Sequence, residues 1–236
     1  MAHLTGTRRA KYVHHMFGRI AARYDLLNGL MSLGRDRHWR REAAALAAPD
    51  PGSAALDLAT GTGALAMELA RSGAASVVGV DFSGPMLAQG RRRVAAAGMA
   101  GRVQLMLGDA HALPFPDGAF SCATVAFGVR NFADPLRAMT ELRRVVRPGG
   151  RVVTLELLRP DHGMAATIYR MYLHRMAPLI DRCVGGDGEA YYYLGSSVQT
   201  FLTPDQFQGM MEAAGFRNVT YHSFHLGVIA VHLALK

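Results

Sequence analysis

The chain has 236 residues, half of them hydrophobic, so it can bury the core of one full domain. Its formal net charge is +8, and the first 50 residues hold nine basic side chains against four acidic ones. Such a basic segment suits nucleic acid, anionic lipid or an acidic substrate. The sequence has no zinc-knuckle, helix-turn-helix or aromatic RNA-reading motif, which argues against nucleic acid.

Cysteine usage and hydropathy predict the compartment. Cys122 and Cys183 lie in apolar surroundings without the spacing of a metal site or a disulfide, which is typical of a reducing cytosol. The first fifteen residues lack the apolar centre of an export signal, and no apolar run is long enough to span a membrane. We therefore expect a cytoplasmic protein.

From Asp50 onward, short apolar runs alternate with amphipathic segments. Strands are predicted at 53–59, 76–81, 102–109, 119–128 and 151–158, and helices at 64–73, 85–98 and 133–147. The last of these helices is expected to stop at Pro148, which two glycines follow. The alternation predicts a parallel sheet with helices on both faces.

The C-terminal third has a different pattern. Residues 162–184 have helical spacing of apolar and basic side chains, and the Tyr-rich segment 189–199 is expected to be a loop. Thr203-Pro204-Asp205-Gln206 is a capping box with proline at the first helical position. Two further strands, 216–224 and 227–235, follow so closely that they predict an antiparallel hairpin at the edge of the sheet.

Two acidic residues mark a ligand site at the carboxyl ends of the predicted strands. Asp57 precedes the glycines Gly61 and Gly63, which let the backbone approach a ligand closely. Asp81 ends the next strand, where a carboxylate can accept hydrogen bonds from both hydroxyls of a ribose. Asp109 ends the third strand and would flank an adenine. The plain alternative for Asp81 is a solvated loop acid.

The glycine motif GTGALA alone also fits a dehydrogenase. Asp57 favours a different class, because it lies inside the strand, where its carboxylate can hold a cofactor tail that carries a positive charge. The block LPFPDGAFSCATVAFGVRNF followed by RVVRPGG adds to this. Together they resemble a class I S-adenosylmethionine (SAM) methyltransferase, which implies a Rossmann-like α/β fold with a mostly parallel seven-stranded sheet.

A narrower resemblance covers nearly the whole chain. The motifs FGRIAARYDLLNGLMSLGRDRHWRR, DLATGTGALA, ALPFPDGAF, FGVRNFADP, EAYYYL and GVIAVHLA occur in the order seen in the ubiquinone/menaquinone biosynthesis C-methyltransferases. This resemblance implies SAM as the cofactor and C-methylation of demethylmenaquinol to menaquinol as the reaction. It also implies an N-terminal helical lid at 1–50, a SAM-binding core at 51–158, a substrate cap at 159–203 and a C-terminal helix and hairpin at 204–236, all in one domain.

Site residues follow position by position. The cofactor residues, some expected from their place at the strand ends and the rest implied by the resemblance, are Asp57, Gly61, Thr62, Gly63, Asp81, Asp109, Ala110 and Ala126. Those implied for catalysis are Arg130 and Asn131, and those implied for the substrate are Tyr24, Asp25 and Tyr193. The chain departs from the family pattern at Ala64 (usually an acid), Ala126 (often a serine) and Tyr192 (an arginine).

Two pairs of these residues have structural alternatives. Arg130 and Asn131 would orient the ring oxygen and the water that takes its proton, or they would only cap the loop that follows the fourth strand. Tyr24 and Asp25 would reach the substrate from the lid, or they would be a core tyrosine beside a helix-capping aspartate. No histidine spacing predicts a metal site.

The resemblance implies a prenylated naphthoquinol as partner. Together with the basic N-terminal segment, this predicts peripheral contact with an anionic membrane surface at the inner face of the cell membrane. Alternatives are a methyltransferase for another small aromatic or lipid-like substrate, and a SAM-binding protein that has lost transfer. Prenyl length and oligomeric state, a homodimer included, are not encoded in any pattern we recognise.

Overall fold

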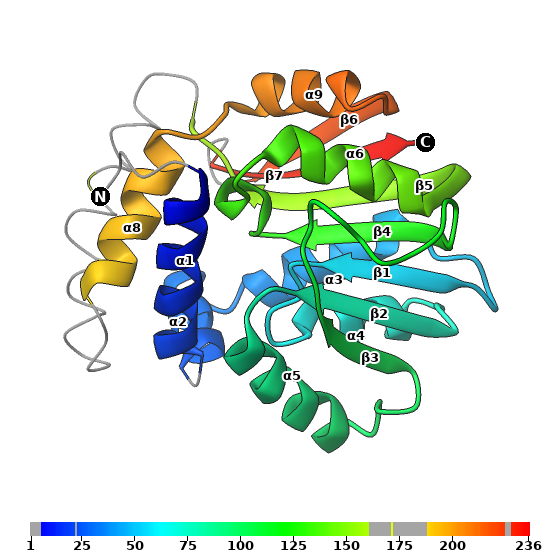
Figure 1. The fold of residues 1–236 in the computed structure, drawn as a ribbon, viewed down its shortest axis with the longest axis horizontal. Helices are drawn as coiled ribbons and strands as arrows, with labels where there is room; N and C mark the ends of the chain where they lie inside the picture. Colours follow the sequence, from blue (N-terminus) through cyan, green and yellow to red (C-terminus); the bar gives the residue numbers. More distant parts are fainter. Residues whose placement is uncertain (1–5, 22, 161–170, 172–187, 225–227) are drawn as a thin grey trace.

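The computed structural model describes residues 6–21, 23–160, 171, 188–224 and 228–236 (Figure 1). One seven-stranded sheet has the order β3-β2-β1-β4-β5-β7-β6. β1 to β5 run parallel, and β7 is antiparallel to both β5 and β6, which confirms the predicted hairpin edge. The strands are β1 (Ala54–Leu58), β2 (Ser76–Asp81), β3 (Val103–Leu107), β4 (Phe120–Ala126), β5 (Val146–Leu157), β6 (Arg217–Phe224) and β7 (Ile229–Leu235).

Helices cover both faces of the sheet and its carboxyl-end edge. They are α1 (Gly6–Ile20), α2 (Tyr24–Met31), α3 (Asp36–Ala47), α4 (Ala64–Arg71), α5 (Gly84–Ala96), α6 (Pro135–Val145), α8 (Gly188–Gln199) and α9 (Pro204–Ala213), with a short 3-10 helix η1 (Val129–Asn131). α3, α4 and α5 bury their apolar sides in the core cluster on one face. α6 and α9 do so on the other face. The α9 capping box forms as predicted, between Thr203 and Gln206.

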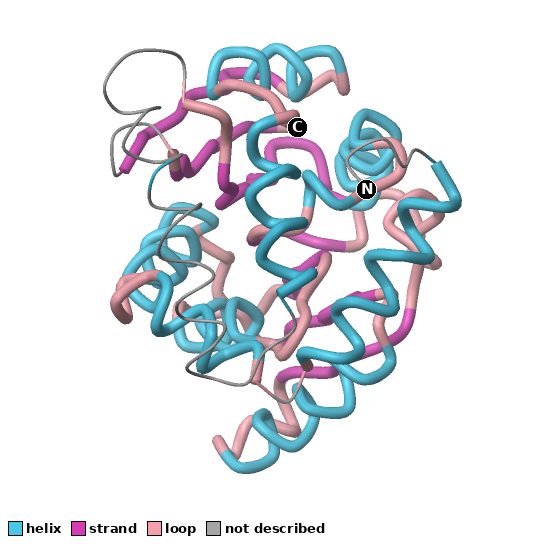
Figure 2. Tube along the Cα trace, turned by 90° about the vertical axis from the view of Figure 1, so that its left-hand side faces the viewer, coloured by secondary structure: helices cyan, strands magenta, loops and turns pink. Residues whose placement is uncertain are grey.

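The helices of residues 1–50 lie in two places. α3 packs on the sheet, with Trp39 and Ala43 inside the core. Among the described helices, α1 and α2 gather at the strand ends together with α8, as Figures 1 and 2 show. Val13 and Met16 of α1 form a small apolar cluster with Tyr193 of α8, which joins the two helices.

The Tyr-rich segment is a helix, α8, so the predicted loop at 189–199 is wrong. Its glycine and serines are loop formers, but the serine hydroxyls bond back to helix carbonyls. Ser196 donates to the Tyr193 carbonyl at 3.0 Å, and Ser197 donates to the Leu194 carbonyl at 2.9 Å. Burial of Tyr193 and Val198 then holds this helix against the rest of the protein.

β5 begins at Val146, earlier than the predicted strand, and continues through Pro148 and both glycines. Its pairing with β4 shifts register between Phe120 and Cys122, which is the mark of a bulge. A Cβ at Gly150 would lie only 2.5 Å from the Ser121 carbonyl oxygen. The glycine therefore permits a close backbone approach inside the strand rather than ending the preceding helix.

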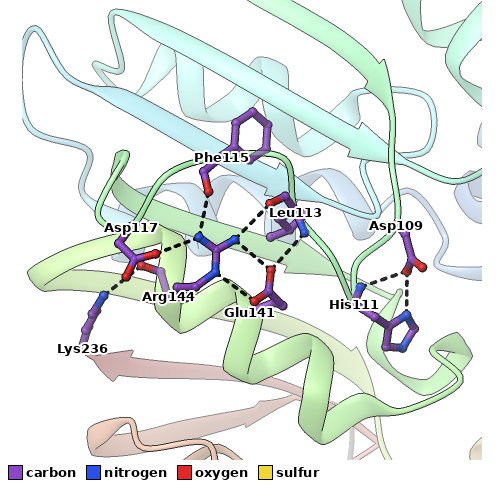
Figure 3. Close-up of polar contacts among 8 residues, drawn as sticks. All are labelled: Asp109, His111, Leu113, Phe115, Asp117, Glu141, Arg144 and Lys236. Atoms are coloured by element: carbon purple, nitrogen blue, oxygen red, sulfur yellow. Dashed lines mark hydrogen bonds and ion pairs between the residues drawn. The ribbon is translucent and has the colours of Figure 1, made fainter.

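The loop between β3 and β4 is held by Arg144 of α6 (Figure 3). Its guanidinium donates to the carbonyls of Leu113 and Phe115 and to the carboxylates of Asp117 and Glu141. Hydrogen bonds from Arg144, more than the opposing effect of partial burial, hold the pKa of Glu141 below its ordinary value. The ALPFPDGAF motif is therefore a braced loop that fixes the start of β4.

In the described part of the chain, no helix is both long and apolar enough to cross a membrane. Residues 161–170 and 172–187, where most of the predicted helix at 162–184 lies, are outside the described structure, as is the side chain of Tyr192.

Candidate active site

A cleft that is open to solvent lies at the carboxyl ends of β1, β2 and β4. α1 and α2 each contribute an aromatic residue to it. The lining residues are Phe17, Tyr24, Ala59, Gly61, Asp81, Phe82, Met86, Ala126, Phe127, Gly128, Asn131 and Phe132. Of the predicted site residues, Tyr24, Gly61, Asp81, Ala126 and Asn131 therefore meet in one cavity.

Asp81 supplies the carboxylate of this cleft. Its two oxygens accept the backbone N–H groups of Gly61 and Ser83, both at 2.8 Å, so β2 and the glycine loop are tied together. The side chain is buried, with 6% of its surface exposed. Each carboxylate oxygen has a further lone pair, so Asp81 can still accept hydroxyl groups from a ligand in the cleft.

Asp57 braces the glycine loop from within. One carboxylate oxygen accepts the Thr60 hydroxyl at 2.7 Å and the other accepts the Thr124 hydroxyl at 2.8 Å. Burial raises the pKa of Asp57 to about 6, although the two hydroxyls act in the opposite direction. Asp57 is absent from the cleft lining, so its observed contacts stabilise the loop between β1 and α4.

Two non-glycine residues in the cleft have left-handed backbone conformations. Ala59 follows β1 with φ 54°, and Phe127 follows β4 with φ 57°. Such a φ is uncommon for alanine and rarer for phenylalanine. The Arg40 guanidinium lies 5.3 Å from the centre of the Phe127 ring, which helps hold the ring in place. Gly128 has no room for a side chain, because a Cβ there would lie 2.5 Å from the Ala59 Cβ.

Arg130 is directed into the protein rather than into the cleft lining. It is 5% exposed and forms an ion pair with Glu156 of β5, which is fully buried. It also donates to the carbonyl of Phe127 at 2.8 Å. Burial alone lowers the pKa of the Arg130 guanidinium, but Glu156, with Tyr24 and Tyr193, outweighs burial and holds that pKa above its ordinary value.

Asn131 lines the cleft beside this ion pair. Its amide nitrogen donates to the Phe127 carbonyl at 3.3 Å, and its amide oxygen accepts the Tyr193 hydroxyl at 3.0 Å. Arg130 and Asn131 therefore share one carbonyl acceptor, that of the strained Phe127. These contacts are the ones expected if Arg130 and Asn131 cap the loop that follows β4. The Asn131 amide still has a second N–H that can donate to a ligand.

Thr62 and Asp25, predicted for cofactor and substrate, bind each other. The Thr62 hydroxyl donates to Asp25 at 2.8 Å, and Arg93 of α5 donates to the other Asp25 oxygen at 2.8 Å. This three-residue contact joins α2 to α5 and to the glycine loop. Asp25 is not among the cleft-lining residues; it is placed next to the glycine loop instead. Gly63, at φ 75°, is the N-cap of α4.

Asp109 stands at the far end of the strand edge, beside His111 (Figure 3). The Asp134 backbone N–H donates to His111 Nε2 at 3.1 Å, so Nδ1 carries the proton and donates to Asp109 at 2.6 Å. Although burial raises the pKa of Asp109, the hydrogen bonds from His111 outweigh it and hold that pKa below the ordinary value. Ala110 is buried in the core cluster next to this acid.

Three residues that hold predicted site side chains in place were not predicted from the sequence. Glu156 is an acid within the apolar strand TLELL, a pattern that should have predicted a buried partner. His111 directly follows the predicted pair Asp109-Ala110 and carries no motif of its own. Arg93 is one of three consecutive arginines, and nothing in the sequence distinguishes it.

The residues present fit a nucleoside-bearing sulfonium cofactor. The cleft combines one buried carboxylate, two glycines in its lining (Gly61 and Gly128) and apolar walls. Among the residues that the structure describes, no cluster of three or more His, Cys, Asp or Glu side chains is suited to a metal ion.

Comparisons with known proteins show the fold and the family of the chain. Among solved structures, a SAM-dependent methyltransferase of Thermotoga maritima, a possible histamine N-methyltransferase, matches with a TM-score of 0.65 at 20% identity, over 94% of this chain and 99% of that one. The Haloferax volcanii putative methyltransferase solved with Trm112 matches with a TM-score of 0.65 at 18% identity, over 93% and 96%. At these identities, the matches show the fold alone.

Curated relatives match over nearly the full length. The demethylmenaquinone methyltransferase of Thermus thermophilus is 49% identical over 92% of this chain and 98% of its own. That of Roseiflexus castenholzii is 43% identical over 97% and 95%, and the ubiquinone/menaquinone biosynthesis C-methyltransferase UbiE of Geobacter sulfurreducens is 40% identical over 98% and 90%. The model of the ubiE/COQ5 methyltransferase family matches residues 5–236. The chain therefore belongs to this family and is a SAM-dependent C-methyltransferase.

Proposed function

We propose that the protein transfers the methyl group of SAM to a ring carbon of demethylmenaquinol and so forms menaquinol. The observation that carries this proposal is one cleft that holds a carboxylate, Asp81, together with an amide, Asn131, between aromatic walls. The names of the relatives from Thermus thermophilus and Roseiflexus castenholzii support the choice of substrate.

The cofactor end of the cleft is formed by Asp81, Gly61 and Ala126. When bound, SAM supplies a methyl group made electrophilic by its sulfonium. Asp81 would accept the ribose hydroxyls, and the backbone at Gly61 would lie against the cofactor. Asp109 and Ala110 would hold the adenine at the adjoining strand end. A carboxyl held ionised by His111 suits acceptance of an amino hydrogen there.

The substrate end of the cleft suits a flat ring. Phe17, Tyr24, Phe127 and Phe132 provide aromatic side chains. The second N–H of Asn131 would donate to a ring oxygen and so fix the neighbouring carbon for transfer. Tyr193 keeps the Asn131 amide in that orientation through its hydrogen bond to the amide oxygen.

Charge behind the cleft favours loss of a proton from the ring hydroxyl. Arg130 stays cationic, and its neighbour Asn131 lines the cleft. A cation beside the cleft would stabilise the phenolate that makes the ring carbon nucleophilic. Arg130 cannot act as a base at any ordinary pH, so the proton would leave to water.

The substrate carries an apolar prenyl chain, so the protein must meet it at a membrane. Peripheral attachment at the inner face of an anionic membrane follows from this substrate and from the basic N-terminal segment. The protein would stay cytoplasmic apart from that contact.

The direct test is methyl transfer from methyl-labelled SAM to chemically reduced demethylmenaquinone, with products identified by mass spectrometry. Label in menaquinone is the expected result. Label only in a small phenol or in a phospholipid headgroup, offered in parallel, would establish another methyltransferase activity. Absence of transfer to all three, with SAM bound, would leave a binding protein.

A further inference from the structure

α2 and the turn that follows it expose three leucines, which we call the leucine face. Leu26 and Leu30 are 56% and 44% exposed, and their i, i+4 spacing puts them on the same side of the helix. Leu33 is 85% exposed and has a left-handed φ of 51°. The φ of Leu33 belongs to the turn that ends α2, in which Leu33 N–H donates to the Leu30 carbonyl at 3.2 Å and Gly34 N–H to the Gly29 carbonyl at 2.7 Å. This turn holds the Leu33 side chain out in water.

Exposed arginines flank the leucine face in the sequence. They are Arg19 and Arg23 before it and Arg35 and Arg37 after it; Arg41, farther along α3, lies 3.9 Å from Glu68. The acids on the described residues between Arg19 and Arg41 are Asp25 and Asp36, and both are engaged. Asp25 binds Arg93 and Thr62. Asp36 accepts the Ser32 hydroxyl at 3.1 Å and lies 3.7 Å from the buried Arg40. The leucine face therefore adjoins segments that carry more exposed basic than acidic side chains.

The same helix takes part in the cleft. Tyr24, its first residue, lines the cleft and packs edge-on against Phe17, with ring centres 5.8 Å apart. The leucine face and the mouth of the cleft are therefore two sides of one eight-residue helix. A surface that engages the leucines is brought next to the mouth.

We propose that the leucine face docks on an anionic lipid bilayer, with Leu26, Leu30 and Leu33 in the interfacial region and the arginines at the headgroups. Exposed apolar side chains next to basic ones are the chemistry of interfacial attachment. The purpose, delivery of a membrane-held substrate to the cleft, rests on the proposed function, but the docking itself does not. Each arginine near an anionic surface strengthens binding by about fivefold.

The test is co-sedimentation of the full chain with vesicles, without SAM or quinol. One vesicle type is phosphatidylcholine alone, and the other contains phosphatidylglycerol as well. The variant replaces both helix leucines (Leu26→Glu with Leu30→Glu). The matched control is Leu136→Glu, because Leu136 is also 44% exposed but lies on α6, away from α2 (Figure 1). Melting temperature and SAM affinity show that both variants are folded.

The wild type and the Leu136 variant should bind anionic vesicles, less so as salt rises, and the double variant should lose at least tenfold in binding. Equal binding by the double variant overturns the proposal, as does equal wild-type binding to both vesicle types. The proposal is also overturned if the wild type does not bind vesicles but forms a dimer through these leucines. Such a dimer would appear as a larger size of the wild type than of the double variant. The vesicle experiment contains no SAM and no quinol. Its results can therefore be interpreted even if the protein does not methylate demethylmenaquinol.

Discussion

Replacement of Arg130 by methionine should destabilise the fold by about 3–5 kcal/mol, because Glu156 would then be a buried carboxylate without a cation. Glu156→Gln should cost a similar amount by leaving the guanidinium uncompensated. The two carboxylate oxygens of Glu156 accept different backbone N–H groups, one that of Arg130 and the other that of Leu157. The single oxygen of a glutamine can keep only one of these bonds, so the loss includes one backbone hydrogen bond as well as the charge pair.

The double variant Arg130→Met/Glu156→Gln should regain part of this stability in a denaturant titration. A residual loss of about 2 kcal/mol is expected, because the Phe127 carbonyl loses one of its two side-chain donors and one backbone N–H loses its carboxylate acceptor. Turnover should stay lower by on the order of a hundredfold, since the cation near the ring oxygen is gone. SAM affinity should stay within a few-fold of the wild type.

Two results would refute this reasoning. A double variant as unstable as the single variants would show that the ion pair is not the source of the loss. A double variant with full stability and full turnover would reduce Arg130 to a structural cap of the loop after β4.

Three further predictions follow from buried groups. Burial lowers the pKa of His232 to about 4. As the pH drops from about 6.5 to 4, this histidine is protonated in the unfolded chain but not in the folded one, so the free energy of unfolding falls by about 3 kcal/mol. In unfolding experiments at several pH values, His232→Phe should flatten this fall of stability with pH, and an unchanged slope would contradict the prediction. The raised pKa of Asp57 acts in the opposite direction, but Asp57 is present in both proteins. Gly128→Ala should lower the free energy of unfolding by about 1–3 kcal/mol and weaken SAM binding. Gly84→Ala, where the added Cβ has open space, should do neither. Equal melting temperatures of the two variants would contradict the crowding at Gly128. Asp81→Asn should weaken SAM binding by about 2–3 kcal/mol in calorimetry, and unchanged affinity in a folded variant would remove Asp81 from the cofactor site.

The sheet was predictable because its signals are local. Strand alternation, the glycine loop after Asp57 and the capping box at Thr203 each depend on neighbouring residues. The errors came where a local signal was overruled. Pro148 and its glycines looked like a stop but form a bulged strand, and the glycine and serines of α8 looked like a loop but bond back to helix carbonyls.

Partners across the fold were not predictable. Asp25 binds Arg93, 68 positions away, and Arg130 of η1 pairs with Glu156 of β5. A sequence pattern places side chains at a strand end but does not say which way they turn. Asn131 and Asp81 meet in the cleft as expected, whereas the Arg130 guanidinium is turned toward β5.

The central claim is methylation at a ring carbon, and deuterium on that carbon tests it most directly. Demethylmenaquinone deuterated at its unsubstituted ring position would be reduced and incubated with SAM and the wild-type protein. C-methylation forms a carbon–carbon bond and releases the deuteron to water, so the account predicts a methylated product without deuterium, together with S-adenosylhomocysteine. A methylated product that keeps its ring deuterium would place the methyl on oxygen and contradict the account.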